Sequence, residues 1–288
     1  SKAMAQQGQE RGGEERLDVV TLGRAGIDLY GEQIGGRLED MASFAKYIGG
    51  SPTNTAVGAA RLGLRAGLIT RVGADHFGRF IVEELEREGV STRGVRSDPE
   101  RLTALVFLGI RDPDTFPLIF YRENCADMAL CADDIDPDFI ASAGALLING
   151  THLSQPGVLA ASLKAATLMK AAGGRVVFDI DYRPVLWGLA GKDNGADRFV
   201  ADRGVTEALQ RVLPLCDLIV GTEEEIHILG GSTDTLAALR AIRAKSAALL
   251  VCKRGADGCV AFPGDIPASL DAGVVGRPCC RRLSAGKR

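Results

Sequence analysis

The sequence has no long apolar run and no basic stripe interleaved with aromatic side chains. Within its 288 residues no segment approaches the roughly 18 consecutive apolar residues that a membrane-spanning helix needs. The formal net charge is −3, and only 5% of the residues are aromatic. Proteins that bind nucleic acid usually present clustered Lys and Arg instead. We therefore expect neither a membrane nor a nucleic acid as a partner, and we favour a small molecule.

Cysteine and histidine are few and scattered. The seven cysteines are Cys125, Cys131, Cys216, Cys252, Cys259, Cys279 and Cys280. Their number is odd and none forms a Cys-x-x-Cys motif, so we expect free thiols and a cytoplasmic location. The three histidines, His76, His152 and His227, are far apart, and none belongs to a His-Glu-x-x-His motif. This spacing predicts neither a metal cluster nor a Ser-His-Asp catalytic set.

Apolar runs of strand length alternate with helical patterns along most of the chain, which is long enough to bury a large core. Strands are predicted at residues 19–22, 66–70, 145–148, 176–178, 218–220 and 248–252, and helices at residues 53–62, 77–87, 155–172, 205–213, 223–229 and 235–244. This alternation predicts an α/β fold with a parallel, doubly wound sheet. Such sheets bind ligands beyond the carboxyl ends of their strands.

Two segments interrupt the alternation. Residues 29–38 and 102–121 have the pattern of β-ribbons. The second predicts a hairpin that turns at Asp112-Pro113-Asp114, between apolar arms at 104–110 and 116–121. We expect the two segments to form a small sheet that projects from the main one as a lid.

The stretch from Gly49 to Ala56 predicts a tight glycine turn that opens a helix. Two glycines let the backbone approach a ligand closely. Ser51 suits the N-cap and Pro52 the first helical position, which leaves Asn54 in the first turn, facing whatever occupies the glycine turn. An ordinary connection between a strand and a helix would have the same pattern, so these residues alone leave both interpretations open.

Several motifs, in this order, resemble the ribokinase-like (PfkB-type) carbohydrate kinases over about residues 17–275. They are Gly23-Arg24-Ala25-Gly26-Ile27-Asp28, which ends the first strand, then Gly49-Gly50-x-x-x-Asn54, Ala60-Arg61-Leu62-Gly63 and Val72-Gly73-x-Asp75-x-Phe77-Gly78. The resemblance implies a ribokinase-like doubly wound sheet flanked by helices, with a small β-sheet lid. It also implies ATP and Mg²⁺ as cofactors and a homodimer formed through the lid.

Three further motifs are similar to the branch of this family that phosphorylates keto-sugar acids. They are Phe120-Tyr121-Arg122-Glu123-Asn124-x-Ala126-Asp127, Phe178-Asp179-Ile180-Asp181-Tyr182-Arg183-Pro184 and Val220-Gly221-Thr222-Glu223-Glu224-Glu225-Ile226. The substrate implied is a six-carbon sugar acid of myo-inositol breakdown, 5-dehydro-2-deoxygluconate, phosphorylated on its terminal hydroxyl. The alternatives are a 2-dehydro-3-deoxygluconokinase, a fructokinase-like enzyme, or a sugar-binding regulatory protein without catalytic activity.

The resemblance implies substrate-binding roles for six residues. Asp28, Gly49, Gly50 and Asn54 would hold sugar hydroxyls, and Arg122 and Arg183 would hold the carboxylate. Each side chain also has a structural interpretation. Asp28 could cap a helix or a turn. Arg122 and Arg183 could be surface arginines that pair with Glu123 or Asp181.

On the nucleotide side the resemblance implies that Glu225 orients Mg²⁺ and phosphate. In the family, an asparagine shares this role from the position that Thr222 occupies here. The change to threonine weakens the assignment of the role to Thr222. The pair also fits a helix capping box, and both interpretations can hold together. Gly255 and Gly258 are implied as contacts to the nucleotide, although the same glycines would suit a hairpin between 249–252 and 259–262.

A kinase of this family is also expected to carry a late Gly-Ala-Gly-Asp segment, whose aspartate is the base and whose glycines form an anion hole. This sequence does not contain it, so we assign no catalytic residue and expect impaired activity. Residues 277–288 contain no acidic side chain. We expect a disordered tail at 1–16, a kinase domain at 17–275 whose carboxyl-terminal part is truncated, and an aberrant tail at 276–288 that arises from a shifted reading frame.

Overall fold

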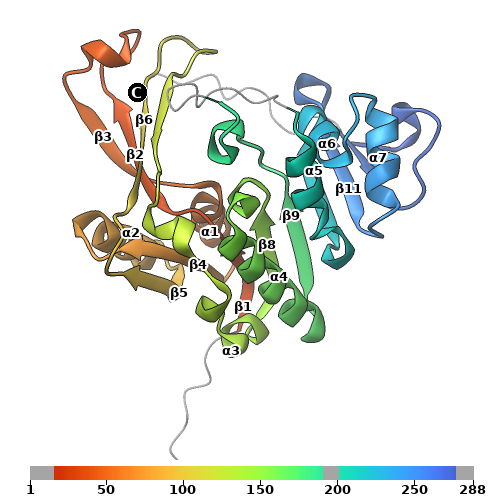
Figure 1. Ribbon diagram of the computed structural model, residues 1–288, viewed down its shortest axis with the longest axis horizontal. Helices are drawn as coiled ribbons and strands as arrows, with labels where there is room; N and C mark the ends of the chain where they lie inside the picture. Colours follow the sequence, from red (N-terminus) through yellow and green to blue (C-terminus); the bar gives the residue numbers. More distant parts are fainter. Residues whose placement is uncertain (1–15, 191–200, 277–288) are drawn as a thin grey trace, which may run out of the picture.

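The computed structural model describes residues 16–190 and 201–276. Its main sheet has nine strands in the order β13-β12-β11-β10-β9-β8-β1-β4-β5 (Figure 1). In chain order these are β1 (Leu17–Leu22), β4 (Ala66–Gly73), β5 (Ser91–Asp98), β8 (Ala143–Asn149), β9 (Arg175–Asp179), β10 (Leu218–Thr222), β11 (Leu249–Lys253), β12 (Cys259–Phe262) and β13 (Val274–Gly276). The pairs from β5 to β11 are parallel, and β12 and β13 are antiparallel.

The six predicted strands are all present, and their apolar runs lie in the parallel part of the sheet. The sequence analysis missed β5, because its residues Ser91–Asp98 are mostly polar. This strand forms the edge of the sheet and pairs only with β4 among the described strands. An edge strand has one neighbour and tolerates charged side chains, so it lacks the apolar run that marks a central strand.

Helices flank the main sheet and confirm the predicted doubly wound α/β architecture (Figure 1). They are α1 (Ser51–Arg61), α2 (His76–Arg87), α3 (Pro137–Ala141), α4 (Pro156–Ala171), α5 (Arg203–Gln210), α6 (Glu223–Gly230) and α7 (Thr235–Arg243). The helix predicted at 205–213 is shorter than expected. It begins two residues earlier, at Arg203, and ends at Gln210, because Pro214 has no N–H to bond the Gln210 carbonyl and a 3₁₀ turn follows at Leu213–Leu215.

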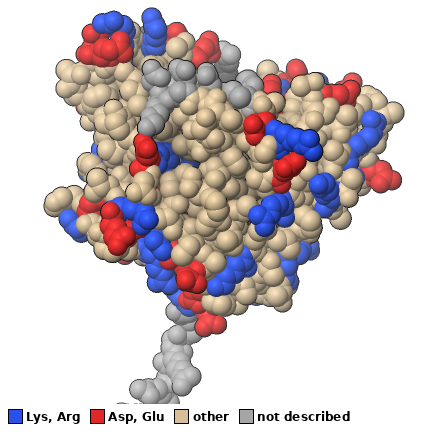
Figure 2. All heavy atoms as spheres, viewed as in Figure 1, with Lys and Arg blue, Asp and Glu red and all other residues tan. Residues whose placement is uncertain are grey.

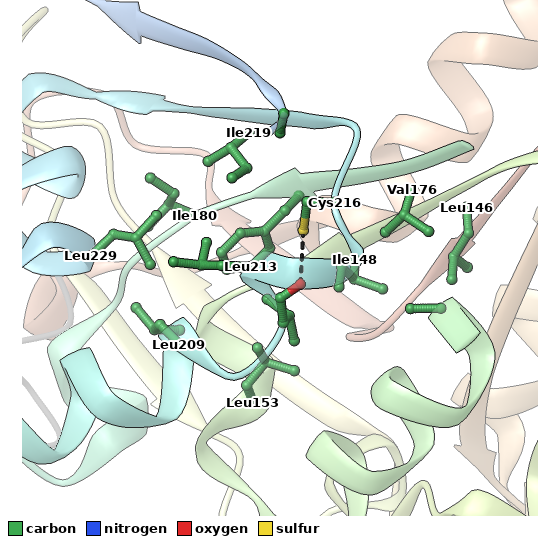
Figure 3. Packing of buried hydrophobic residues seen from close by; sticks show 14 of the residues in the cluster. Leu146, Ile148, Leu153, Val176, Ile180, Leu209, Leu213, Cys216, Ile219 and Leu229 are labelled. Atoms are coloured by element: carbon green, nitrogen blue, oxygen red, sulfur yellow. Dashed lines mark hydrogen bonds between the residues drawn. The ribbon is translucent and has the colours of Figure 1, made fainter. Parts of the chain in front are cut away.

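The larger of two hydrophobic cores lies around β8, β9 and β10 and the helices that cover them. Figure 3 shows part of it, with Leu146 and Ile148 of β8 and Val176 of β9 near the buried Cys216. The Cys216 thiol donates a hydrogen bond to the Val212 carbonyl at 3.2 Å, and burial raises its pKa to about 12. A thiol in this environment stays protonated and behaves as a small apolar side chain.

A second sheet of four strands forms the lid, in the order β3-β2-β6-β7 (Figure 1). Its strands are β2 (Gly26–Gly31), β3 (Phe44–Gly49), β6 (Ala104–Leu108) and β7 (Leu118–Tyr121). The predicted hairpin is confirmed, since β6 and β7 are antiparallel and Asp112 pairs with Thr115 at the turn.

The first lid segment, predicted at 29–38, was placed wrongly. Strand β2 covers Gly26–Gly31, and the chain then turns through Gly35 and Gly36 into a 3₁₀ helix at Leu38–Asp40. The partner strand β3 was not predicted, and it leads directly into the glycine turn at Gly49 and Gly50. The lid and the start of α1 are therefore continuous.

The charge distribution on the surface and the length of the helices are relevant to the kinds of partner that were considered. Figure 2 shows basic and acidic side chains interspersed over one face of the molecule. Within residues 16–190 and 201–276, no helix has both the length and the apolar character required to span a bilayer.

Candidate active site

A cavity of about 350 Å³ lies where the lid meets the carboxyl ends of the main strands. It is lined by all six residues predicted to bind the sugar, namely Asp28, Gly49, Gly50, Asn54, Arg122 and Arg183. Arg24, which follows β1, and Asp181, which follows β9, line the same cavity. Residues from distant parts of the sequence thus meet at the edge where a doubly wound sheet binds its ligands.

Asp28 lies in the middle of lid strand β2, opposite Tyr47 of β3 and Val106 of β6. Two expectations are corrected here: β1 ends at Leu22, so Asp28 does not end the first strand, and it caps neither a helix nor a turn. Burial raises the pKa of Asp28 to about 6, although nearby arginines act to lower it. This carboxyl can therefore accept or donate a hydrogen bond near neutral pH.

The two glycines before α1 are required by their neighbours. A Cβ atom on Gly49 would overlap the Asp28 carboxylate, and one on Gly50 would overlap the Arg24 carbonyl oxygen. Gly50 has a φ of 96° and is itself the N-cap of α1. The N-cap predicted at Ser51 is thus one residue late, because Ser51 already lies in the helix. Asn54 is in the first turn of α1, as predicted, with its side chain exposed at the cavity.

Arg122 follows β7 and is buried, with only 5% of its surface exposed. Its partner is Asp127, with which Nη2 forms a buried ion pair. The sequence analysis considered a surface pair with Glu123 or Asp181 for this arginine. That interpretation is wrong, because the ion pair of Arg122 is buried and its partner is Asp127. Asp127 Oδ2 also accepts a hydrogen bond from the Ala25 amide at 3.0 Å. One carboxylate thus links Arg122 to the beginning of the lid.

The pair between Arg24 and Asp181 was missed by the sequence analysis as a feature of the site. Arg24 Nη2 lies 2.7 Å from Asp181 Oδ2, and both side chains are largely buried. Asp181 has a φ of 38°, which is uncommon for a residue other than glycine. Each residue lies within three positions of the end of a predicted strand, and that position was the signal that could have identified them. Arg183 is held by its backbone amide, which donates to Thr151 Oγ1 at 3.1 Å.

The capping box at Thr222 and Glu225 is confirmed. The Thr222 amide donates to Glu225 Oε1 at 3.0 Å, and the Glu225 amide donates to Thr222 Oγ1 at 3.2 Å. Glu225 Oε2 accepts a hydrogen bond from the Tyr182 amide at 2.6 Å. Burial, together with the charges of Asp181 and Glu225, raises the pKa of the nearby Asp179 to about 7.

Gly255 and Gly258 lie in the turn between β11 and β12, which form the hairpin considered in the sequence analysis. Both have positive φ angles, 57° and 87°. A Cβ atom on Gly255 would meet no other atom within 4 Å, so this side of the turn is open. Neither glycine lines the cavity that contains Asp28. In the described part of the chain, no group of three or more His, Cys, Asp and Glu side chains is arranged to hold a metal ion.

The fold and the site define a ribokinase-like α/β protein with a lidded, sugar-sized cavity at the strand ends. Its residues 16–269 match the pfkB family of carbohydrate kinases. The chain therefore belongs to the pfkB family, whose members are sugar kinases.

Individual relatives agree with this assignment. The 5-dehydro-2-deoxygluconokinase of Shouchella clausii is 37% identical over 252 residues, which cover 86% of this chain and 73% of the relative. The crystal structure of a PfkB protein from Polaromonas sp. JS666 is 31% identical, with a TM-score of 0.77, and the match covers 91% of this chain and 83% of that one. A putative Ribokinase II from E. coli, solved with ATP and Mg²⁺, is 25% identical, with a TM-score of 0.73 and coverages of 85% and 75%.

Proposed function

We propose that this chain transfers a phosphoryl group from ATP to the terminal hydroxyl of 5-dehydro-2-deoxygluconate, a six-carbon keto-sugar acid of myo-inositol breakdown. The observation that carries the proposal is the convergence of Asp28, Asn54, Arg122 and Arg183 on one cavity. The name of the relative from Shouchella clausii supports this substrate over those of a 2-dehydro-3-deoxygluconokinase or a fructokinase. Because that relative is named a kinase, its similarity also favours an enzyme over a regulatory protein without catalytic activity.

The side chains of the cavity suit both ends of such a substrate. Asp28 and Asn54 offer a carboxyl and an amide, which can accept hydrogen bonds from sugar hydroxyls or donate to their oxygens. Arg122 and Arg183 offer planar guanidinium groups, whose paired N–H donors match a carboxylate. A sugar acid would therefore lie with its hydroxyls toward the lid strand and its carboxylate toward the arginines.

The lid contributes by excluding water. Val106 of β6 and Leu118 of β7 are buried and face the cavity from the lid sheet. Removing water from around the bound sugar strengthens its polar contacts and hinders hydrolysis of the phosphoryl donor. The lid sheet is also the surface through which we propose that two copies of the chain form a homodimer.

We assign the nucleotide to the turn at Gly255 and Gly258 and to Glu225. Gly255 and Gly258 present no side chain, and the space around Gly255 is open, so this turn could accept the adenosine portion of ATP at close range. Glu225 would orient Mg²⁺ and phosphate, while its two oxygens keep their bonds to backbone amides. When bound, ATP would supply the electrophilic phosphorus, and Mg²⁺ would neutralise negative charge on the phosphates. We place this reaction in the cytoplasm, where cysteine thiols stay reduced.

Titration calorimetry on the 288-residue chain tests the proposal, because binding does not depend on the catalytic base that the sequence leaves unassigned. We expect 5-dehydro-2-deoxygluconate to bind more tightly than 2-dehydro-3-deoxygluconate, fructose or ribose. Tighter binding of fructose would support the fructokinase-like alternative. An ADP-release assay with the preferred sugar then separates an enzyme from a regulator, since a regulatory protein binds without turnover.

A further inference from the structure

Arg24 is a buried arginine with only part of its hydrogen-bonding capacity used by the protein. Only 6% of its surface is exposed, and the one hydrogen bond that its side chain makes among the described residues runs from Nη2 to Asp181 Oδ2 at 2.7 Å. Its Nε atom is buried and has no hydrogen-bond partner there. A guanidinium group carries five N–H donors, and donors left unsatisfied in a native protein require an explanation.

Arg122, which lines the same cavity, has the same arrangement. It also uses Nη2 for a buried aspartate, in this case Asp127, and its Nε is likewise buried without a hydrogen-bond partner among the described residues. Arg24 and Arg122 line the same cavity and both act electrostatically on Asp28. The site therefore contains two arginines that are each held by one carboxylate and retain donors for a further acceptor.

The backbone of Asp181 indicates that this arrangement is maintained at a cost. Its φ of 38° lies in the left-handed region, which is unfavourable for residues other than glycine, although Asp and Asn tolerate it best. Such strain is concentrated at functional sites. In this conformation Asp181 reaches Arg24 from the end of β9, across the end of β8.

We infer that Arg24, oriented by Asp181, is a further substrate-contact residue that binds the carboxylate of the sugar acid together with Arg122. This inference rests on the proposed function for the choice of substrate. It adds a residue to the site and gives Asp181 the role of a positioning residue. A phosphate group would satisfy the same donors, so the test includes a phosphorylated sugar.

The test measures binding of three probes by calorimetry, with the fluorescence of the single tryptophan, Trp187, as a second readout. The probes are 5-dehydro-2-deoxygluconate, fructose and fructose 6-phosphate. Arg24→Gln is expected to weaken binding of the sugar acid at least about tenfold and that of fructose less than about threefold. Arg61→Gln, which removes an exposed arginine paired with Glu88, is the matched control and should change neither value.

Arg24→Gln alone leaves the Asp181 charge buried and unpaired, which could weaken binding or folding indirectly. The double variant Arg24→Gln/Asp181→Asn removes both charges and keeps a residue that tolerates positive φ. If Arg24 binds the substrate, the double variant stays at least about tenfold weaker than wild type for the sugar acid. Recovery of wild-type affinity in the double variant would overturn the inference, as would equal losses for the sugar acid and for fructose.

The wild-type chain separates this inference from the proposed function. If it binds neither the sugar acid nor a related keto-sugar acid, the proposed function fails, whatever the variants do. If it binds the sugar acid and the Arg24 variants bind equally well, only the inference fails. Tighter wild-type binding of fructose 6-phosphate than of the sugar acid would mean that the arginines bind phosphate, which overturns the carboxylate assignment.

Discussion

Arg122 and Asp127 form a buried ion pair at the base of the lid, five residues apart in the chain. The Asp127 carboxylate also receives a hydrogen bond from the Ala25 amide, and its backbone carbonyl lies 2.9 Å from His152 Nε2. Three segments of the chain thus meet at one residue, Asp127. Because Arg122 also lines the substrate cavity, the pair links the stability of this region to the shape of the site.

Replacing Asp127 by Asn should destabilise the protein strongly. The substitution keeps the size of the side chain but leaves the Arg122 charge buried and unpaired, which typically costs about 3–5 kcal/mol. Urea denaturation followed by circular dichroism measures the loss. Asp40→Asn, which breaks an exposed pair with Arg37, should leave the midpoint unchanged. Equal midpoints for Asp127→Asn and wild type would show that the buried pair contributes little to stability.

His152 should make the stability depend on pH. Its burial lowers its pKa to about 4 from an ordinary value of 6.5. The unfolded chain therefore binds a proton between pH 6.5 and 4 that the folded chain does not, so this contribution is present above pH 6.5 and is lost as the pH falls to 4. The full difference is on the order of 3 kcal/mol.

Asp28 and Asp179 have raised pKa values and act in the opposite direction over part of this range. The informative measurement is therefore the difference between wild type and His152→Gln, determined by urea denaturation at several pH values. The advantage of the wild type over the variant should shrink as the pH is lowered from 7 to 4. His76→Gln changes an exposed histidine and should parallel the wild type throughout. A constant difference between wild type and His152→Gln would contradict the assignment.

The central strands of the main sheet were predictable because they are continuous apolar runs of strand length, which are typical of strands buried on both faces. Strands β5 and β3 were not predictable in the same way. The first is polar, and the second is recognised only through its pairing with β2, which begins 18 residues earlier in the chain. Their positions depend on tertiary contacts that a local pattern does not contain.

The candidate site shows the same division. Gly49, Gly50 and Asn54 were identified because a glycine turn that opens a helix is a local pattern, whereas Asp28 was identified through the resemblance to the family. The pairing of Arg24 with Asp181 was not, since the two residues are 157 positions apart. They meet because β1 and β9 are both neighbours of β8, an order of strands that the sequence does not state. Electrostatic partners across a sheet therefore have to be read from the structure.

Asn54→Ala should weaken sugar binding without affecting stability. The Asn54 side chain is exposed at the cavity, so its removal creates no buried void and leaves no buried group unpaired. Loss of its hydrogen bonds to a sugar hydroxyl should reduce the affinity for 5-dehydro-2-deoxygluconate at least about tenfold, equivalent to about 1.4 kcal/mol. Calorimetry and a thermal melt measure the two effects separately. Unchanged affinity with an unchanged melt would remove Asn54 from the site.

Gly50→Ala and Gly63→Ala offer a matched comparison at the two ends of α1. Both glycines have positive φ angles, 96° and 91°, so an alanine at either position costs about 1–2 kcal/mol in backbone strain. Only at Gly50 would the new Cβ atom also overlap a neighbouring group, the Arg24 carbonyl oxygen, whereas at Gly63 it meets nothing within 4 Å. Gly63→Ala should therefore lose some stability and keep full sugar affinity. Gly50→Ala should lose more stability and at least about tenfold in affinity, because the turn that carries Arg24 must move. Denaturation and calorimetry on the same preparations measure both effects, and a Gly50→Ala protein with wild-type affinity would show that the glycine turn does not shape the cavity.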